Sequence, residues 1–139
     1  MAIANTELLQ AWATLWSSND TDAFLSLFTQ NCHYEDVAFG LTNEGKPQLK
    51  EFFRATRTAL PDLKMSLQSC FTTENHGAIE WLMTGTHQGA FHDIPATGQA
   101  IQVRGMTWIE LEDGKIKTNR DYYNLLTVLK QIGMMLEFA

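Results

Sequence analysis

One acidic residue inside a predicted strand constrains this chain more than any other feature. The segment 113–133 begins with Asp113-Gly114, a dipeptide that favours a tight hairpin because glycine accepts positive φ without strain. β-forming residues predict a strand over 115–123, and apolar residues at helical spacing predict a helix over 125–132. Asp121 lies in that strand. A carboxylate facing a core is costly, so Asp121 is either solvated or used in the protein's function.

The rest of the chain predicts helices first and strands later. Periodic apolar residues predict three further helices, over 5–16, 21–28 and 47–60. Four further strands are predicted, over 32–37, 63–73, 78–88 and 99–112. The segments 39–45 and 89–98 are predicted loops. The resulting order, ααβαββββα, predicts an α+β fold with helices gathered on one face of a largely antiparallel sheet.

Composition excludes several function classes. The 139 residues fit a single domain, 1–139, and 45% hydrophobic residues can build a core. A net charge of −6 argues against nucleic acid as a partner, and the scattered basic residues and lack of long apolar runs argue against a membrane. Cys32 and Cys70 form no CxxC motif, so a reduced, cytoplasmic protein is the simplest expectation.

The predicted hairpin also predicts which residues share a face with Asp121. Counting outward from a two-residue turn places Met106 opposite Asp121 and Trp108 opposite Asn119. Opposed residues lie on one face of a sheet, and a slip of one residue would reverse the assignment. The face of Asp121 is therefore predicted to carry Arg104, Met106, Trp108, Asp121 and Tyr123. Such a face suits a hydrophobic or aromatic small-molecule substrate.

Each candidate residue also has a structural interpretation. Asp121 could form an ion pair with Arg120 or Arg104, and Asp36 could cap the loop that follows it. His87 and His33 could carry protons at neutral pH or simply bond the backbone. The four histidines show no HxH or HxxxH spacing, so no metal site is predicted.

Four stretches resemble the SnoaL-like polyketide cyclases of the NTF2-like superfamily. They are residues 45–63, residues 81–99, Asp113-Gly114-Lys115-Ile116 and the segment 129–133. The most specific is Gly85-Thr86-His87 followed by Ile94-Pro95-x-Thr97-Gly98. The resemblance implies a cone in which a strongly curved mixed or antiparallel sheet wraps on three to four helices around a pocket. It also implies a homodimer formed by sheet faces.

The resemblance further implies an activity. These cyclases close rings by an intramolecular aldol reaction on polyketide esters, without metal or organic cofactor, and an aspartate on the last strand moves the proton. Asp121 stands at that place. Asp36 is similar to the proton-shuttling aspartate of ketosteroid isomerases, which also need a tyrosine on the first helix, where this chain has Trp12 and Trp16. The stretch 120–124 resembles limonene-epoxide hydrolases, but their Arg-x-Asp is absent at 104–106.

The leading hypothesis is a cofactor-independent, polyketide cyclase-like enzyme that acts on an enolisable carbonyl compound with a carboxylate as general acid/base. Its predicted catalytic residues are Asp121, Asp36 and His87, and its predicted substrate-binding residues are His33, Trp81, Arg104, Met106, Trp108 and Tyr123. The alternatives are a non-catalytic small-molecule-binding module on the same fold, or an isomerase- or epoxide hydrolase-like enzyme. A cone packed shut, with a cavity under about 300 Å³, would favour a purely structural dimer.

Overall fold

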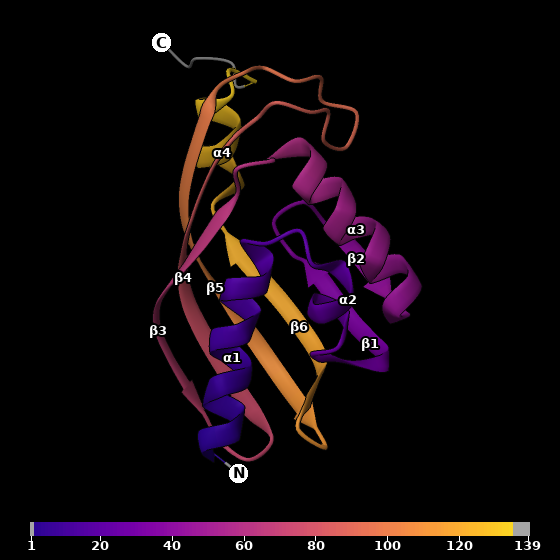
Figure 1. The fold of residues 1–139 in the computed structure, drawn as a ribbon. Coiled ribbons are helices and arrows are strands. Elements are labelled where there is room, and N and C mark those ends of the chain that lie inside the picture. Colours follow the sequence, from indigo (N-terminus) through magenta and orange to yellow (C-terminus); the bar gives the residue numbers. More distant parts are fainter. Residues whose placement is uncertain (1, 135–139) are drawn as a thin grey trace.

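The computed structural model describes residues 2–134, with side chains described from Asn5 onward. The helices are α1 (Ala2–Trp16), α2 (Thr21–Leu25), α3 (Gly45–Ala59) and α4 (Leu125–Gln131). The strands are β1 (Phe28–Asp36), β2 (Leu41–Glu44), β3 (Lys64–Thr72), β4 (His76–Thr86), β5 (Ala100–Glu112) and β6 (Lys115–Tyr123). They form one curved sheet in the order β2-β1-β6-β5-β4-β3, with the helices packed on its concave side (Figure 1). The expected α+β architecture with a mixed, curved sheet is confirmed.

One parallel pairing in this sheet positions two acidic residues. β1 runs parallel to β6, whereas every other neighbouring pair is antiparallel. The register places Asp36 beside Asp121 at the carboxyl ends of the two strands. Because residues at matched positions of neighbouring strands point to the same face, both carboxylates point into the concave side.

The predicted hairpin is present, but its register beyond the turn is wrong by one residue. Asp113 and Gly114 both have positive φ, as a tight two-residue turn requires. The pairing then shifts by one residue. Glu110 and Leu111 are consecutive in β5, but their partners in β6, Thr118 and Ile116, are separated by one residue. Lys117 is the extra residue of this β-bulge. As a result Thr107, not Met106, lies opposite Asp121.

The bulge has a clear physical cause in side-chain burial. Ile116 is fully buried and pairs with the buried Leu111, so both face the core near the turn. Asp121 also faces inward, which strict alternation from Ile116 would forbid. The bulge reconciles the two by bringing Asp121 to the inner face. Regular alternation along β5 places Arg104, Met106 and Trp108 on the outer face, contrary to the prediction.

Two element predictions fail where local signals are weak. The predicted loop 39–45 contains the short edge strand β2, which has no buried residue and no apolar alternation. The predicted helix 21–28 ends at Leu25, and Phe28 begins β1 instead. None of the four helices within residues 2–134 combines the length and apolar character that crossing a membrane would need.

The aromatic core joins the helices to the concave face of the sheet. Phe24 stacks on Phe53 with ring centroids 4.4 Å apart, and Trp16 lies 4.8 Å from Phe24. The buried Arg57 donates to the carbonyls of Pro61 and Leu63 at 2.8 and 2.9 Å, which fixes the link from α3 to β3. These contacts hold the helices in place around the interior.

A short turn closes one end of the molecule. The end of α3, the segment 87–99 and α4 lie together there (Figure 1). Phe91 and Ile94 exchange backbone hydrogen bonds, and His92 and Asp93 between them have positive φ, as in a two-residue hairpin turn. Gln88 and Gly89 donate to the carbonyl of Ala59, which anchors the segment to the end of α3.

Close packing of Trp81 on Gly105 gives a test of this fold. A Cβ at position 105 would lie 2.4 Å from the Trp81 ring and 2.7 Å from the Tyr122 carbonyl oxygen. We expect Gly105→Ala to lower the free energy of unfolding by about 1–3 kcal/mol in urea, because the ring has to move. Gly85→Ala is the matched control, since its nearest contact is 3.4 Å from a new Cβ. Equal losses in the two variants would contradict the packing.

Candidate active site

The concave side of the sheet and the helices enclose a mostly apolar cavity. Its walls include Trp16, Phe52, Met65, Trp81 and Ile101. The part of the cavity that the centre of a water-sized sphere can reach has a volume of about 80 Å³. The whole empty space between the lining atoms, including the part open to solvent, is about 740 Å³. The smaller value is several times the roughly 10–15 Å³ that one water needs. The interior is therefore not packed solid, and it has room for a small group. The cavity is nevertheless below the roughly 300 Å³ at which ligand pockets usually start, and by that criterion it favours the purely structural alternative.

Asp121 is the most completely bonded polar group in this cavity. Its Oδ2 accepts from the Tyr34 hydroxyl at 2.5 Å. Its Oδ1 accepts from the Thr107 hydroxyl at 2.6 Å and from the Asn119 amide at 2.8 Å. The three donors come from β1, β5 and β6, so the carboxylate is held from three neighbouring strands.

Two tryptophans orient those donors. The Trp12 indole donates to Asn119 Oδ1 at 2.9 Å, which turns the amide nitrogen toward Asp121. The Trp81 indole donates to Thr107 Oγ1 at 2.9 Å, so the hydroxyl hydrogen is left for Asp121. An indole N–H can only donate, so each tryptophan fixes the direction of the bond beyond it.

Burial controls the proton affinity of Asp121. Removal from water raises its pKa to about 7; the nearby Asp36 also raises it, while its three hydrogen bonds lower it. The predicted alternative of an ion pair is wrong, because Arg120 bonds Glu35 on the outer face and Arg104 also lies there. A carboxylate of this kind can both accept and return a proton near neutral pH.

Asp36 forms a second carboxylate–phenol pair beside the first. Its Oδ1 accepts the backbone N–H of Phe39 at 3.1 Å, so it does cap the loop that follows. Its Oδ2 accepts from the Tyr123 hydroxyl at 2.9 Å. Burial raises the pKa of Asp36, while its hydrogen bonds and the nearby His92 lower it. Burial raises the pKa of both phenols, Tyr34 and Tyr123, so each stays a donor.

His87 explains why the two parts of the most specific motif occur together. Its Nδ1 lies 3.0 Å from the hydroxyl of Thr97, and its backbone N–H donates to Gln99. Gly98 donates in turn to the His87 carbonyl. The stretches 85–87 and 94–98 are thus joined around one imidazole, whose Nε2 is buried in the cavity wall without a partner among the described residues.

The structure separates the predicted site residues into two groups. Asp121, Asp36, His87, Trp81 and Tyr123 line the cavity. The other four lie on the outer face, contrary to expectation, and they are His33, Arg104, Met106 and Trp108.

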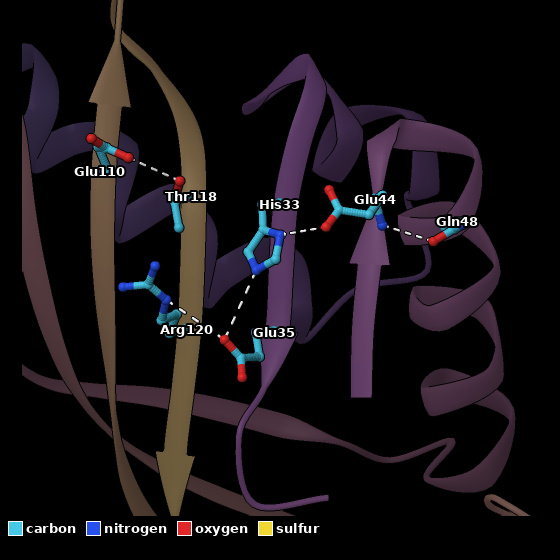
Figure 2. Close-up of polar contacts among 7 residues, drawn as sticks. All are labelled: His33, Glu35, Glu44, Gln48, Glu110, Thr118 and Arg120. Carbon is cyan, nitrogen blue, oxygen red and sulfur yellow. Dashed lines mark hydrogen bonds and ion pairs between the residues drawn. The ribbon is translucent and has the colours of Figure 1, made fainter. Parts of the chain in front are cut away.

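His33 belongs to a row of charged side chains on that outer face (Figure 2). Its Nδ1 lies 2.7 Å from Glu44 Oε1, and Glu35 lies between His33 and Arg120. Arg120 also lies over the ring of Trp108, 4.8 Å from its centroid. His33 faces outward because Cys32 and Tyr34 on either side of it face inward.

Sequence reasoning missed several residues around Asp121, namely Tyr34, Thr107 and Asn119. Alternation over 32–36 contained a signal for Tyr34, since it stands two residues before Asp36. Thr107 and Asn119 depend on the bulge. Among the described residues no three His, Cys, Asp or Glu side chains gather as metal ligands.

Comparisons with known proteins agree with this architecture. The model of the SnoaL-like polyketide cyclase family matches residues 6–132. The cyclase AurE of Calcarisporium arbuscula is 26% identical over 112 residues, 79% of each chain. The structure of a candidate SnoaL-like polyketide cyclase from Jannaschia sp. CCS1 has a TM-score of 0.87 at 20% identity, covering 97% of this chain and 95% of that one.

A second solved structure shares the fold and contains a small ligand. It is a protein with a ketosteroid isomerase-like fold from Catenulispora acidiphila DSM 44928, in complex with trimethylamine. Its TM-score is 0.82 at 25% identity, covering 96% of this chain and 97% of that one. These likenesses confirm the expected curved sheet wrapped on helices.

The raised pKa of Asp121 predicts that the difference in stability between wild type and Asp121→Asn changes with pH. Between about pH 4 and pH 7 the folded protein keeps a proton on Asp121 that the unfolded chain releases, so this group's contribution to stability is lost as pH rises. Asparagine cannot titrate. The free energy of unfolding of Asp121→Asn should therefore improve relative to wild type from pH 4 to pH 8, measured by urea unfolding. Asp113→Asn removes the same charge from an exposed turn as a control. A difference that is constant with pH would refute the assignment.

Proposed function

The chain belongs to the SnoaL-like polyketide cyclase family, and from this premise we propose that it closes a ring in a polyketide-like carbonyl compound without a cofactor. Asp121 is the general acid/base of the proposed reaction. The observation that carries the proposal is a carboxylate with a pKa of about 7 in the wall of an apolar cavity. Such a group is matched to proton transfer near neutral pH, where its two protonation states are both populated.

The proposed reaction is an intramolecular aldol addition. Asp121 removes a proton from a carbon next to a carbonyl, and the C–H electron pair becomes an enolate. The enolate carbon forms a C–C bond to a second carbonyl of the same molecule, whose oxygen becomes an alkoxide. Asp121 returns the proton to that alkoxide, so no net proton, electron or water is consumed. The apolar walls support this sequence because they keep water away from the enolate.

Asp36 has a supporting role in this proposal. It stands beside Asp121 in the neighbouring parallel strand and is itself only 4% exposed. Its negative charge makes Asp121 a stronger base, and the Tyr123 hydroxyl keeps it oriented. Asp36 is the second candidate for the group that handles the substrate proton.

A second function, binding without catalysis, has one observation in its favour. The Catenulispora acidiphila protein with this fold was solved in complex with trimethylamine. Two buried carboxylates in an apolar cavity would also suit a small organic cation. Under this alternative, trimethylammonium binds with an affinity that falls on Asp36→Asn or Asp121→Asn, and no proton is exchanged from any ketone.

Deuterium exchange into a simple enolisable ketone tests the catalytic proposal without knowledge of the natural substrate. In heavy water, the protein should speed loss of the methyl protons of acetophenone, followed by proton NMR. Asp121→Asn should lower this rate by about 100-fold or more, the usual contribution of a general base. The wild-type rate should rise as pH increases through about 7, as Asp121 ionises.

Asp113→Asn again provides the matched control, because Asp113 lies in the exposed turn and is not part of the cavity lining. Its exchange rate should equal that of wild type. Wild-type activity retained in Asp121→Asn would remove Asp121 from the mechanism, and the same test on Asp36→Asn would then decide whether Asp36 is the base.

We also propose that two copies associate through the outer face of the sheet. Met106 and Tyr122 pair across β5 and β6 there, and their side chains are 48% and 47% exposed. Trp108, 36% exposed, lies on the same face. Large apolar side chains grouped on one surface are typical of an interface, and a self-complementary contact gives a twofold dimer.

A charged residue at the centre of this face should break the dimer. Light scattering coupled to gel filtration should give a dimer mass for the wild type and a monomer mass for Met106→Glu, because the new carboxylate would be buried without a partner. Leu126→Glu is the control, since Leu126 is 45% exposed on α4 rather than on the sheet. A monomeric wild type would end this proposal.

A further inference from the structure

Two residues that line the cavity each carry a buried nitrogen atom without a full hydrogen bond. The atoms are Nε1 of Trp16 and Nε2 of His87, on side chains that are 3% and 2% exposed. The described residues contain one other such atom, Asn43 Nδ2 on the edge strand β2, which is not part of the cavity lining. Buried polar atoms are nearly always bonded, so an unpaired pair in one cavity indicates atoms that a ligand completes.

Trp16 differs from Trp12 and Trp81, the two other buried tryptophans. The indoles of Trp12 and Trp81 donate to neighbouring side chains, whereas that of Trp16 does not. Its ring lies 6.2 Å from that of Tyr34, centroid to centroid. Burial is the main cause of the raised pKa of Tyr34, and hydrogen bonding from the Trp16 side chain lowers it. That contact does not meet the geometry of a full hydrogen bond. The N–H therefore lies beside the Tyr34 hydroxyl of the Tyr34–Asp121 pair and is open to a better acceptor.

An indole N–H can only donate, which specifies the ligand atom that it would meet. That atom is an acceptor, such as a carbonyl oxygen. A carbonyl oxygen at this place puts the adjacent carbon near Asp121, and the N–H would stabilise the negative charge that develops on the oxygen during proton removal.

His87 offers the second position. Its Nδ1 is engaged by the Thr97 hydroxyl, which also accepts the backbone N–H of Gln99 at 3.3 Å. The ring is therefore fixed, and only Nε2 is left for a ligand. An imidazole nitrogen can accept from a hydroxyl or donate to a carbonyl, so this position suits a second oxygen of either kind.

The charges of the cavity restrict the substrate further. Its lining contains two carboxylates, Asp36 and Asp121, and no lysine or arginine. A ligand with a free carboxylate would meet like charge in an apolar space without a compensating cation. An ester, ketone or lactone avoids this repulsion.

We propose that the Trp16 indole N–H binds the reacting carbonyl oxygen and that His87 Nε2 binds a second oxygen of the same uncharged substrate. The role of Trp16 in catalysis depends on the proposed function, whereas the two hydrogen bonds do not. The substrate class is an apolar compound with two separated oxygen functions and no free acid. Trp16 is thereby a further catalytic residue, and His87 sets specificity.

The test of Trp16 uses indole N–H resonances of 15N-labelled protein and three matched probes. Acetophenone offers a carbonyl, ethylbenzene has similar shape without an acceptor, and benzoate carries a charge. Acetophenone should move one indole proton downfield, the one missing in Trp16→Phe, and ethylbenzene should not. Acetophenone should bind about tenfold more weakly to Trp16→Phe, with no change for ethylbenzene, and benzoate should bind wild type at least about tenfold more weakly than acetophenone.

The test of His87 compares acetophenone with 4-hydroxyacetophenone, which adds an oxygen at the far end. The hydroxyl should strengthen binding to the wild type, and His87→Phe should abolish that gain while leaving acetophenone affinity unchanged. Trp108→Phe, a change on the outer face, is the control and should behave as wild type with every probe.

Several outcomes would overturn the proposal. They are acetophenone binding with no shift of the Trp16 resonance, equal binding of benzoate, no measurable binding of any ketone, or a hydroxyl gain that survives in His87→Phe. The resonance shift is read on the unaltered protein. If Trp16→Phe fails to fold, the signals missing in Trp12→Phe, Trp81→Phe and Trp108→Phe identify that of Trp16 by elimination, since the chain has four tryptophans. Normal probe binding without deuterium exchange would instead refute the proposed function and leave both hydrogen bonds assigned.

Discussion

A carboxylate buried in an apolar interior is the constraint on which the rest of this structure depends. Asp121 has no cationic partner in the described part of the chain, and its charge is balanced only by donors from Tyr34, Thr107 and Asn119. Indoles on α1 and β4 orient two of those donors. Five elements of the fold therefore converge on one group, and losing any of these donors would leave a buried charge poorly compensated. The arrangement keeps the carboxyl group poised between its two protonation states rather than permanently ionised.

The same geometry distinguishes this site from the ketosteroid isomerases it resembles in part. Those enzymes take a phenol from the first helix, and here that helix supplies Trp16 instead. The phenol beside Asp121 comes from β1, as Tyr34, and a second phenol, Tyr123, serves Asp36. Each acid thus has its own hydroxyl donor, which is possible because β1 and β6 are parallel and bring both acids to one level.

Much of the fold could be predicted from the sequence, because helical and strand periodicities and the Asp113-Gly114 turn are strong local signals. The two aspartates and His87 could be identified as candidates because they lie in stretches that resemble known families. The side chains that contact Asp121 could not be predicted, because their pairing with it depends on a bulge that no local sequence preference indicates. The stretch 101–111 did contain evidence that Arg104 faces outward, because Ile101, Val103, Ile109 and Leu111 all stand at odd positions. Counting residues outward from the turn gives the wrong face, because the bulge shifts the register by one residue.

The bulge at Lys117 has an implication for how such a pocket can arise or disappear. Side chains of a strand alternate between faces, so the extra residue decides which half of the later strand points inward. Deleting Lys117 itself would turn the bulge into regular pairing, with Asp121 still facing inward opposite Thr107. Regular pairing with Lys117 retained would instead turn Arg120 and Tyr122 inward and Asp121 to the solvent. The acidic interior of this strand sequence therefore depends on the extra residue being absorbed in a bulge near the hairpin.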